Sequence, residues 1–469
     1  MIKPQFQGDA SAIASTRLSA KEVNALYNAF PRKALSFAAD RKTFGAFWQK
    51  TAKLRAKLPP YSKQNENERH AYRLIRGLEI DARKLFLRSH VDAIYDALTA
   101  KCSRFVRVEE LCVAAAKLLP GLVPSPKESA AEDGLLQSQK AGLEIDQGIF
   151  VSAVLRSEQA GRHLCHAMLL PTQEASELLP KFVKDGRLEL PGASIERRGK
   201  AAFLTYRNPR FLNAEDQATL AGFETCVDLA LLDPQVEIVV LRGGTVEHPK
   251  YKDRRMFGSG INLTHLYHGR IPFLWYLTRD LGYVNKLYRG LAMPNDAAPD
   301  EFGGQTIEKT FIAAVDTFAI GGHCQVLLAV DYVIAEKTAF MTLPARKEGI
   351  IPGAANMRLP RAVGDRLARQ AIQYERRLEC DSPEGRMICD EIVEPGTMDE
   401  AVERVVKGLT SSGVVSAASN RRAFRITQEP LDMFRNYFSV YAREQAYCHF
   451  SPALIANLEK YWNAASRKP

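Results

Sequence analysis

The stretch Phe318–Asp331, which reads FAIGGHCQVLLAVD, decides the fold. It follows Thr310–Val315, an apolar run that is typical of a β-strand. Val326 to Ala329 is apolar without alternation, which predicts a buried helix after the two glycines. Glycine lets the backbone approach a ligand, and the first N–H groups of a helix are unpaired. A strand, a glycine turn and a helix in this order predict a place for a negatively charged oxygen. A tight turn with packing glycines is the alternative.

A second glycine-rich stretch, Phe257–Leu263, supports the first interpretation. It follows the strand candidate Val236–Leu241 and reads FGSGINL. Two N–H donors from two separate turns can converge on one carbonyl oxygen, which is the geometry of an oxyanion hole. One such donor typically stabilises a transition state by roughly 3 to 4 kcal/mol.

Length and composition indicate a globular protein of two or three domains. The chain has 469 residues, of which 46% are hydrophobic and 25% charged, with a formal net charge of +10. The basic residues are spread along the chain without an aromatic-basic motif, so nucleic acid is not the expected partner. A small polyanionic ligand needs only a local basic patch.

Cysteine spacing and the N-terminus favour the cytoplasm. The eight cysteines are widely spaced without a CxxC motif, so we expect free thiols in a reducing compartment. The start of the chain lacks the apolar core of a signal peptide, and no apolar run approaches the ~20 residues of a membrane span. The segment His163-Leu164-Cys165-His166 is a weak metal candidate, because its spacing matches no usual zinc site.

The chain divides into three predicted parts. Residues 1–190 have helical periodicity, with a capping-box pattern at Ser19–Glu22, and are predicted to form an α-helical N-terminal domain that caps the core or takes part in assembly. Residues 191–400 contain recurring strand–strand–helix units, one with an amphipathic helix predicted over Ala214–Leu232, which predict an α/β core of stacked sheets with surrounding helices. Residues 401–469 are again predicted to be helical, with helices over 401–409 and 429–459.

Four motifs in this order resemble the crotonase (enoyl-CoA hydratase/isomerase) superfamily: Arg207–Ala214, Phe257–Ile261, Ile320–Gln325 and Gly349–Asn356. The resemblance implies the crotonase fold of repeated ββα units and an acyl-CoA thioester as substrate. It also implies that the N–H groups of Ile261 and Gly322 hold the thioester oxygen. C-terminal helices build trimers or hexamers in that superfamily, so we expect a homotrimer or homohexamer.

The positions of the two hydratase acids are occupied by Gln325 and Ala345. A hydratase needs two carboxyl groups to move the protons of one water, and neither side chain here can do so. Ordinary enoyl-CoA hydration is therefore not expected. Glu348 lies nearby but out of register with the second acid; it is a weak spare for that acid, and we favour its interpretation as an ion-paired scaffold residue.

A narrower resemblance is to arylacetyl-CoA dioxygenases of the same superfamily, which use O₂ without a metal or organic cofactor. By this resemblance Glu215 and Arg279 bind two ring hydroxyls, Gln325 orients the substrate, and Ala345 and Ile350 line a small dry pocket. Taken singly, Glu215 is also typical of a first-turn helix acid, Arg279 of a surface charge and Gln325 of a polar core residue. The alternatives are a non-oxygenase crotonase, such as a thioesterase or isomerase, and a non-catalytic acyl-CoA-binding protein.

CoA binding is predicted from the same resemblance. Arg210, Ser259 and Gly260 match adenine and ribose contacts of the family, and the basic run from His248 to Arg255 offers charges for phosphates or is simply a solvated loop. His323 stands where many relatives have a third glycine. Its imidazole is expected to be neutral and to point into the scaffold, with a reshaped pocket as the alternative.

Overall fold

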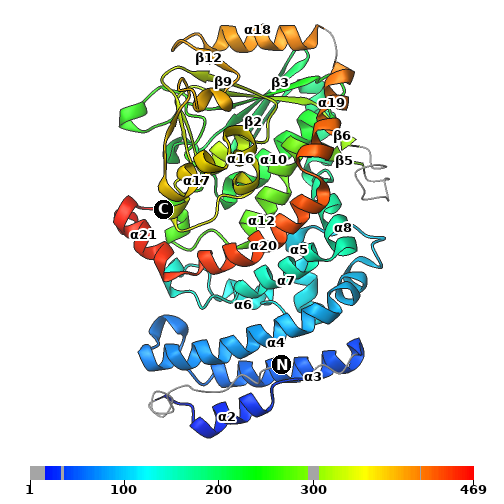
Figure 1. Cartoon of the computed structure of the whole chain (residues 1–469), viewed down its shortest axis with the longest axis vertical. Helices are drawn as coiled ribbons and strands as arrows, with labels where there is room; N and C mark the ends of the chain where they lie inside the picture. The colour runs from blue at the N-terminus through cyan, green and yellow to red at the C-terminus, as the bar shows by residue number, and fades with distance from the viewer. Residues whose placement is uncertain (1–15, 33–35, 294–305, 412–413) are drawn as a thin grey trace.

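A helical part and an α/β part lie one above the other in the computed structural model, which describes residues 16–32, 36–293, 306–411 and 414–469 (Figure 1). The first helix begins at the predicted capping box, in which Ser19 and Glu22 bind each other's backbone N–H groups. The helical part consists of α2 (Ala20–Asn28), α3 (Phe37–Arg55), α4 (Glu66–Thr99), α5 (Val108–Leu118), α6 (Pro126–Ala130), α7 (Ile145–Arg156), α8 (Glu158–Leu169) and α9 (Gln173–Asp185).

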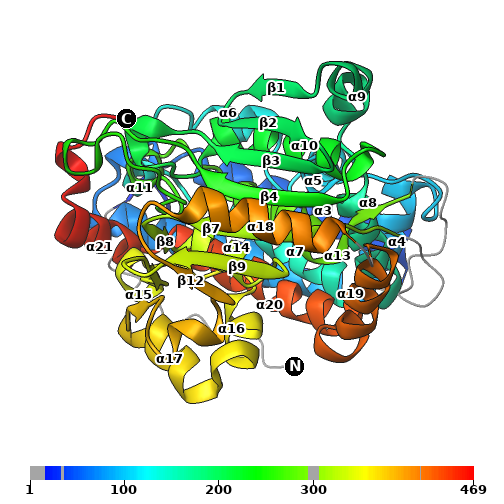
Figure 2. The same ribbon diagram turned by 90° about the horizontal axis from the view of Figure 1, so that it is seen from above.

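A seven-stranded sheet forms the centre of the α/β part (Figure 2). Its first three strands are antiparallel, and from the third strand onward all neighbours are parallel. Parallel strands are covered on both faces, which explains why Val239, Val240 and Leu241 are all fully buried. In order across the sheet the strands are β1 (Arg187–Leu190), β2 (Ala193–Arg198), β3 (Ala201–Tyr206), β4 (Ile238–Gly243), β7 (Thr310–Val315), β9 (Tyr332–Glu336) and β12 (Glu391–Val393).

Helices cover the two faces of this sheet. Helix α10 (Gln217–Leu232) packs on β2 and β3, and α18 (Met398–Thr410) packs on β4 and β9. Ile238, Val240 and Ile312 point to the α18 side, where they meet Met398 and Val402.

A second, three-stranded sheet completes the predicted ββα units. It contains β8 (Phe318–Ile320), β10 (Phe340–Thr342) and β11 (Leu378–Glu379). Strands β7 and β8 are followed by α14 (Gly322–Leu327), and β9 and β10 are followed by α15 (Ala345–Glu348). This arrangement confirms the predicted stacked α/β fold.

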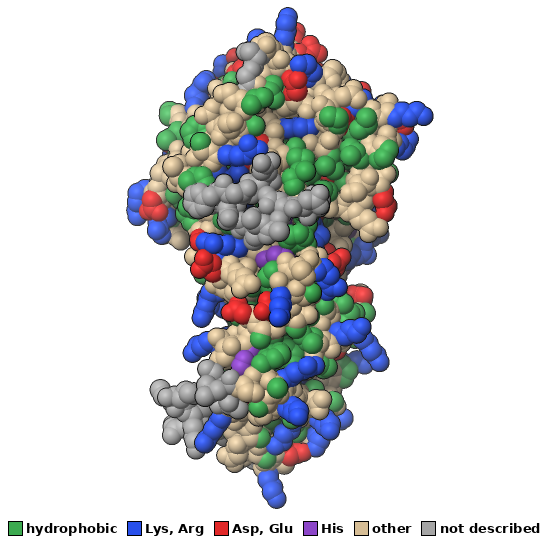
Figure 3. Space-filling model, turned by 90° about the vertical axis from the view of Figure 1, so that its right-hand side faces the viewer, with side chains coloured by type: hydrophobic (Ala, Val, Ile, Leu, Met, Phe, Trp, Pro, Cys, Tyr) green, Lys and Arg blue, Asp and Glu red, His purple; other side chains and the backbone are tan. Residues whose placement is uncertain are grey.

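The remaining elements surround the sheets. They are α11 (Leu263–Tyr267), α12 (Leu274–Leu281), α13 (Tyr283–Arg289), β5 (Leu291–Ala292), β6 (Thr306–Ile307), α16 (Ala355–Val363), α17 (Asp365–Tyr374), α19 (Val414–Gln428), α20 (Leu431–His449) and α21 (Pro452–Trp462). Within the described residues no helix combines the length and the apolar character that crossing a bilayer requires. Lys and Arg side chains are scattered over the face shown in Figure 3, as expected for basic residues that are spread along the chain.

Three predicted helix boundaries were wrong. The helix after the two glycines begins at Gly322 and ends at Leu327, so it is shorter than the apolar run suggested. The helix predicted from Ala214 begins at Gln217, because the Asp216 side chain caps it. The predicted helix over 429–459 is two helices, α20 and α21, and Ser451 caps the second one.

Helix α20 connects the two parts of the molecule. It packs along α7 of the N-terminal region. Gly148 makes this contact close, since a methyl group on it would lie 2.7 Å from the carbonyl oxygen of Ala442. The C-terminal segment therefore packs within its own chain, while its role in oligomerisation stays a prediction.

Glu429, between α19 and α20, is a buried charge at this connection. Its carboxylate is 0% exposed and binds the guanidinium groups of Arg358 on α16 at 2.9 Å and Arg361 at 2.7 Å. Arg289 lies 3.5 Å away. Burial opposes ionisation of Glu429, but the arginine charges outweigh it and lower its pKa to about 2.

We expect Glu429→Gln to lower the free energy of unfolding by about 3 to 5 kcal/mol, because it leaves buried arginines without their counter-charge. Urea unfolding at pH 7 measures this. Glu444→Gln is the matched control, since the Glu444–Arg443 pair is about half exposed and its loss changes stability by less than about 0.5 kcal/mol.

The ion pairs of Glu429 with Arg358 and Arg361 also predict that the stability of the fold decreases in acid. The folded-state pKa of Glu429 lies below its ordinary value of 4.5, so its stabilisation is present above pH 4.5 and is lost as the pH falls toward 2. The difference in stability between wild type and Glu429→Gln should shrink over that range. A difference that stays constant down to pH 2 would contradict the assignment.

Candidate active site

Two glycine turns lie side by side at the ends of two strands. The N–H of Ile320 donates to the carbonyl oxygen of Gly258 at 3.0 Å, and Gly258 forms an isolated bridge with Ala319. Gly260 has a φ of +81°, and a methyl group on it would lie 2.9 Å from the carbonyl oxygen of Ile320 and 3.2 Å from the nitrogen of Gly322. Only glycine allows this backbone conformation and this approach together.

The two predicted oxyanion donors are free in this arrangement. Gly260 donates its N–H to His323 Nδ1 at 3.1 Å, and Gly321 donates to the carbonyl oxygen of Thr342 at 2.9 Å. The next amide along each turn, that of Ile261 and that of Gly322, donates to no other residue in the described part of the chain. Ile261 and Gly322 line the same pocket. Two unpaired N–H groups at one pocket are what an oxyanion hole requires.

The pocket itself is narrow and largely apolar. It has a cavity volume of about 30 Å³, room for roughly two water molecules. A larger acyl group therefore enters only when lining side chains move. The wall consists of Ile261, Trp275, Tyr276, Arg279, Asp280, Gly321, Gly322, Gln325, Leu343, Ala345, Glu348, Ile350, Ile351, Pro352 and Tyr441.

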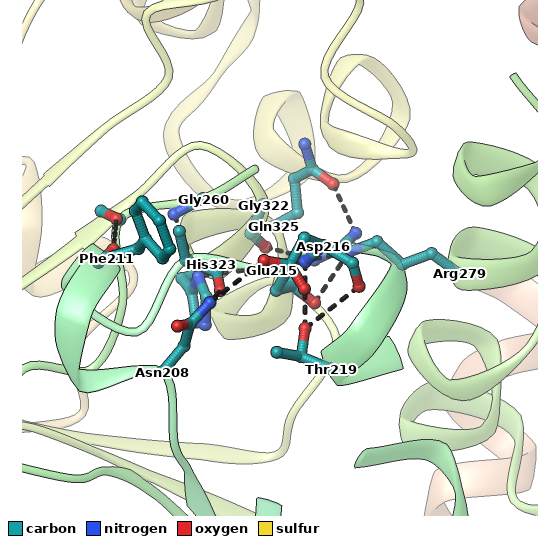
Figure 4. Close-up of polar contacts among 12 residues, drawn as sticks. Asn208, Phe211, Glu215, Asp216, Thr219, Gly260, Arg279, Gly322, His323 and Gln325 are labelled. Carbon is teal, nitrogen blue, oxygen red and sulfur yellow. Dashed lines mark hydrogen bonds and ion pairs between the residues drawn. The ribbon is translucent and has the colours of Figure 1, made fainter. Parts of the chain in front are cut away.

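The buried guanidinium of Arg279 uses all of its N–H groups, and Figure 4 shows it beside Glu215 and Gln325. Its Nε and Nη2 bind the carboxylate of Glu215 at 2.8 to 3.0 Å. Its Nη1 donates to Asp280 at 2.7 Å and to Gln325 Oε1 at 2.9 Å, and its Nη2 also donates to the carbonyl oxygen of Gly322 at 2.8 Å. A ring hydroxyl can bind Arg279 only by sharing or replacing one of these bonds.

Glu215 does not line this pocket but lies behind Arg279. Its side chain is 5% exposed and also accepts a hydrogen bond from the hydroxyl of Tyr283. Burial opposes ionisation, but Arg279 outweighs it and lowers the pKa of Glu215. Arg279 is therefore not a surface charge, and Glu215 is not a solvated helix acid. Tyr283 lies in the sequence segment that suggested Arg279, although nothing in the sequence gave it a role.

His323 points into the scaffold, which confirms the expectation. Its ring is fully buried and packs against Tyr206 and Phe257. Burial lowers the pKa of His323 to about 4, so the imidazole is neutral at pH 7. Because Nδ1 accepts from Gly260, the proton of the neutral ring is assigned to Nε2.

The predicted CoA contacts lie outside the pocket wall. Arg210 and His248 are exposed, and the hydroxyl of Ser259 donates to the carbonyl oxygen of Phe211 at 3.1 Å. The N–H of Gly260 is taken by His323, and its carbonyl oxygen accepts from the N–H of Glu215 at 2.8 Å. Their role in binding CoA stays a prediction.

Glu348 was interpreted as ion-paired, and this was wrong. Its carboxylate lines the pocket and is 5% exposed, yet it has no hydrogen bond or ion pair with any residue in the described ranges. Burial alone raises the pKa of Glu348 to about 7. The neighbouring bases Arg346 and Lys347 pair with Glu375 instead.

The sequence analysis missed three aromatic residues of the pocket. Trp275 and Tyr276 come from α12, and Tyr441 comes from α20, about a hundred residues beyond the nearest motif. Their apolar spacing is that of any buried helix, so no local signal distinguished them.

The histidine pair proposed as a weak metal candidate has other partners. His163 Nδ1 lies 2.8 Å from the hydroxyl of Tyr95, and its ring stacks on Phe105. His166 also packs against Phe105. Among the residues that the structure describes, there is no group of three His, Cys, Asp or Glu side chains that could hold a metal ion. All eight cysteines are free.

Comparisons with known proteins agree with this geometry. The enoyl-CoA hydratase/isomerase family matches residues 304–433. The chain is 43% identical over 417 residues to (3,5-dihydroxyphenyl)acetyl-CoA 1,2-dioxygenase of Amycolatopsis orientalis. This match covers 89% of the present chain and 94% of the relative. It is 26% identical over 238 residues to a short-chain-enoyl-CoA hydratase of Clostridium acetobutylicum, covering 50% of this chain and 82% of that protein. An enoyl-CoA hydratase structure from Mycobacterium avium subsp. paratuberculosis aligns at 19% identity and a TM-score of 0.48, covering 59% of this chain and 97% of the other.

Stacked sheets with two unpaired amides at one pocket provide the geometry that polarising a carbonyl oxygen needs. The 43% identity over 89% of the chain then identifies the family. The chain belongs to the enoyl-CoA hydratase/isomerase family, the crotonase superfamily.

We expect Gly260→Ala to lower catalytic turnover at least about 100-fold, because the added methyl group pushes the two amides apart and one oxyanion donor is lost. Steady-state kinetics measures this. Gly199→Ala is the matched control: Gly199 also has a positive φ, of +57°, but nothing lies within 4 Å of an added methyl group. Equal effects of the two substitutions would show that only backbone strain matters.

Proposed function

We propose that this protein is a dioxygenase that converts 3,5-dihydroxyphenylacetyl-CoA, or a related arylacetyl-CoA, and O₂ into the arylglyoxylate and free CoA without a metal or organic redox cofactor. The atoms balance, because O₂ supplies the ketone oxygen and one carboxylate oxygen while the CoA thiolate leaves. The proposal is supported by the unpaired amides of Ile261 and Gly322 at a pocket whose two hydratase-acid positions hold Gln325 and Ala345. The extended similarity to the Amycolatopsis enzyme favours this substrate.

The first chemical requirement is an enolate. Loss of a proton from the carbon next to the thioester leaves negative charge on the thioester oxygen. Two N–H donors stabilise that charge more than they stabilise the neutral carbonyl, so they favour the enolate. An electron-rich aryl enolate can then give one electron to O₂, which removes the spin restriction on their combination.

The second requirement is recognition of the ring. Under this proposal the ring hydroxyls bind at Arg279 and Glu215, where a guanidinium donates to a phenolate and a carboxylate accepts from a phenol. Glu215 lies behind Arg279. A ring hydroxyl of the substrate therefore reaches the Glu215 carboxylate only when the Arg279–Glu215 ion pair opens. Gln325 keeps its amide NH₂ group for the substrate while its oxygen accepts from Arg279.

The third requirement is a place for O₂. Ala345 and Ile350 contribute apolar surface to the pocket wall. An alanine in place of a hydratase acid leaves a small apolar space, which suits a diatomic gas better than water.

Bound CoA would extend past Arg210, His248, Ser259 and Gly260. We also propose that the protein is a homotrimer or homohexamer, that it works in the cytoplasm, and that it serves antibiotic biosynthesis.

An oxygen electrode tests the proposed reaction. Chelator-treated protein should consume one O₂ for each CoA released from 3,5-dihydroxyphenylacetyl-CoA, and mass spectrometry should find two ¹⁸O atoms in the arylglyoxylate when ¹⁸O₂ is used. CoA release under nitrogen at the aerobic rate would instead identify a thioesterase. Tight binding without turnover of any thioester would identify a binding protein.

We expect Arg279→Lys to lower the rate of O₂ uptake by more than about tenfold. Lysine keeps the charge opposite Glu215 but cannot reproduce the fork that also holds Asp280, Gln325 and the carbonyl oxygen of Gly322. Arg107→Lys is the matched control, because Arg107 also binds a glutamate through two bonds, at 2.8 and 2.9 Å to Glu224, and lies outside the pocket. Turnover of Arg279→Lys equal to that of the control would remove the assignment.

A further inference from the structure

A carboxyl group that none of the predicted roles uses faces the oxyanion turn. Glu348 is the last residue of α15 and lies on the wall of the pocket that contains both free amides. A methyl group on Gly321 would lie 3.6 Å from Glu348 Oε1 and 3.9 Å from Oε2. The carboxyl group therefore lies beside the turn that positions the Gly322 amide and faces the same pocket as both free amides.

The surroundings leave this carboxyl group without a partner among the described residues. Its basic neighbours on α15, Arg346 and Lys347, turn outward to Glu375 at the end of α17. On α12, Arg279 has no N–H left for it, and Tyr276 contributes a phenol whose pKa is raised by burial and by the charge of Glu348. Other titratable groups on elements packed around the pocket and α15 include Asp280 on α12, Tyr441 and His449 on α20, His323 and Cys324 on α14, Asp365, Arg366, Arg369 and Tyr374 on α17, and Glu459, Lys460 and Tyr461 on α21.

Glu348 is also the one lining carboxyl group free to accept a proton. The described residues of the pocket wall include two carboxyl groups, those of Asp280 and Glu348. Asp280 is held by Arg279 at 2.7 Å and by a hydrogen bond from Tyr441. Gln325 and Ala345, at the positions of the hydratase acids, cannot act as bases.

We propose that Glu348 is the general base that removes the proton from the carbon next to the thioester carbonyl. The C–H bond breaks, its proton goes to a Glu348 carboxylate oxygen, and its electron pair moves into the thioester to give the enolate held by the amides of Ile261 and Gly322. No oxidant takes part in this step. The inference rests on the proposed function for its substrate, but the proton transfer itself precedes any reaction with O₂.

The electrostatic environment suits this role. Burial without a compensating partner raises the pKa of Glu348 to about 7. A base is most effective when its pKa lies near the working pH, because it is then both ionised and basic. An unpaired buried carboxyl group destabilises the fold, and such groups are concentrated at functional sites.

Proton exchange tests the proposal without O₂. Wild-type protein incubated anaerobically in D₂O with 3,5-dihydroxyphenylacetyl-CoA, and separately with phenylacetyl-CoA, should place deuterium next to the carbonyl, read by mass spectrometry of the recovered thioester. Glu348→Gln should slow this exchange by about 100-fold or more, the typical range for a general base. Glu348→Asp keeps a carboxylate one methylene further away and should retain part of the rate.

Two further measurements separate a base from a structural residue. The exchange rate of wild type should rise with pH through about 7 and then level off, because only the ionised carboxylate accepts the proton. Glu348→Gln should lose this dependence while its Kd for the thioester stays within about threefold. Glu132→Gln is the matched control, since burial also raises the pKa of Glu132 but it lies in the N-terminal region and binds the N–H of Ala141.

The outcomes are distinct. Exchange by Glu348→Gln within about threefold of wild type, a parallel loss of thioester binding, or no exchange by wild type with either thioester would each overturn the proposal. O₂ uptake distinguishes the proposed function: wild type that exchanges protons but consumes no O₂ is a proton-abstracting enzyme with Glu348 as base, not a dioxygenase. Full O₂ uptake by Glu348→Gln would keep the dioxygenase and remove Glu348 as its base.

Discussion

The site depends on two backbone turns that approach more closely than side chains permit. Gly260 and Gly321 both have positive φ angles, and their backbones meet where a methyl group on Gly260 would contact the Ile320 oxygen and the Gly322 nitrogen. Each turn binds one amide internally and leaves the next amide for the pocket. His323 is part of this device, because its neutral ring holds the Gly260 N–H and so fixes the direction of the following amide of Ile261.

The helical N-terminal region supports the site from behind. Its helix α7 packs along α20, and α20 places Tyr441 on the pocket wall. Further contacts cross the same boundary: the Glu144 carboxylate accepts from the N–H of Phe273 at 2.9 Å, and Lys140 donates to the carbonyl oxygen of Gly269 at 2.7 Å. The region therefore packs behind one wall of the pocket.

The sequence was sufficient for the backbone of the site and insufficient for its side-chain pairing. Glycines at fixed places in two strand–turn–helix units identify the oxyanion turns, because few residues tolerate those φ angles. Whether a carboxylate has a partner depends on side chains far away in sequence. Glu348 stands next to two basic residues in the chain, which suggested an ion pair, but the short helix α15 turns Arg346 and Lys347 away from it.

Tertiary packing also determines the aromatic wall of the pocket and the helix ends, which the periodicity of apolar residues did not predict. The pattern of apolar residues places α12 and α20 in the core, but any buried helix has that pattern, so the aromatic wall of the pocket was not recognised. Asp216 moved the start of α10 by capping it, and the apolar run after Gly322 stays buried without remaining helical beyond Leu327. Helix ends depend on single capping contacts, which a pattern averaged over a window does not detect.

Glu215 and Glu348 are driven to opposite protonation behaviour by their surroundings. Arg279 lowers the pKa of Glu215, which stays ionised, while isolation raises that of Glu348 to about 7. Groups whose environments push their pKa values apart are suited to different tasks in one reaction. A permanently charged Glu215 keeps Arg279 in place, and a carboxyl group with a pKa of about 7 at Glu348 can take a proton and return it. Since Arg279 has no N–H to spare, the arrangement that fixes the first carboxylate is also what leaves the second one free.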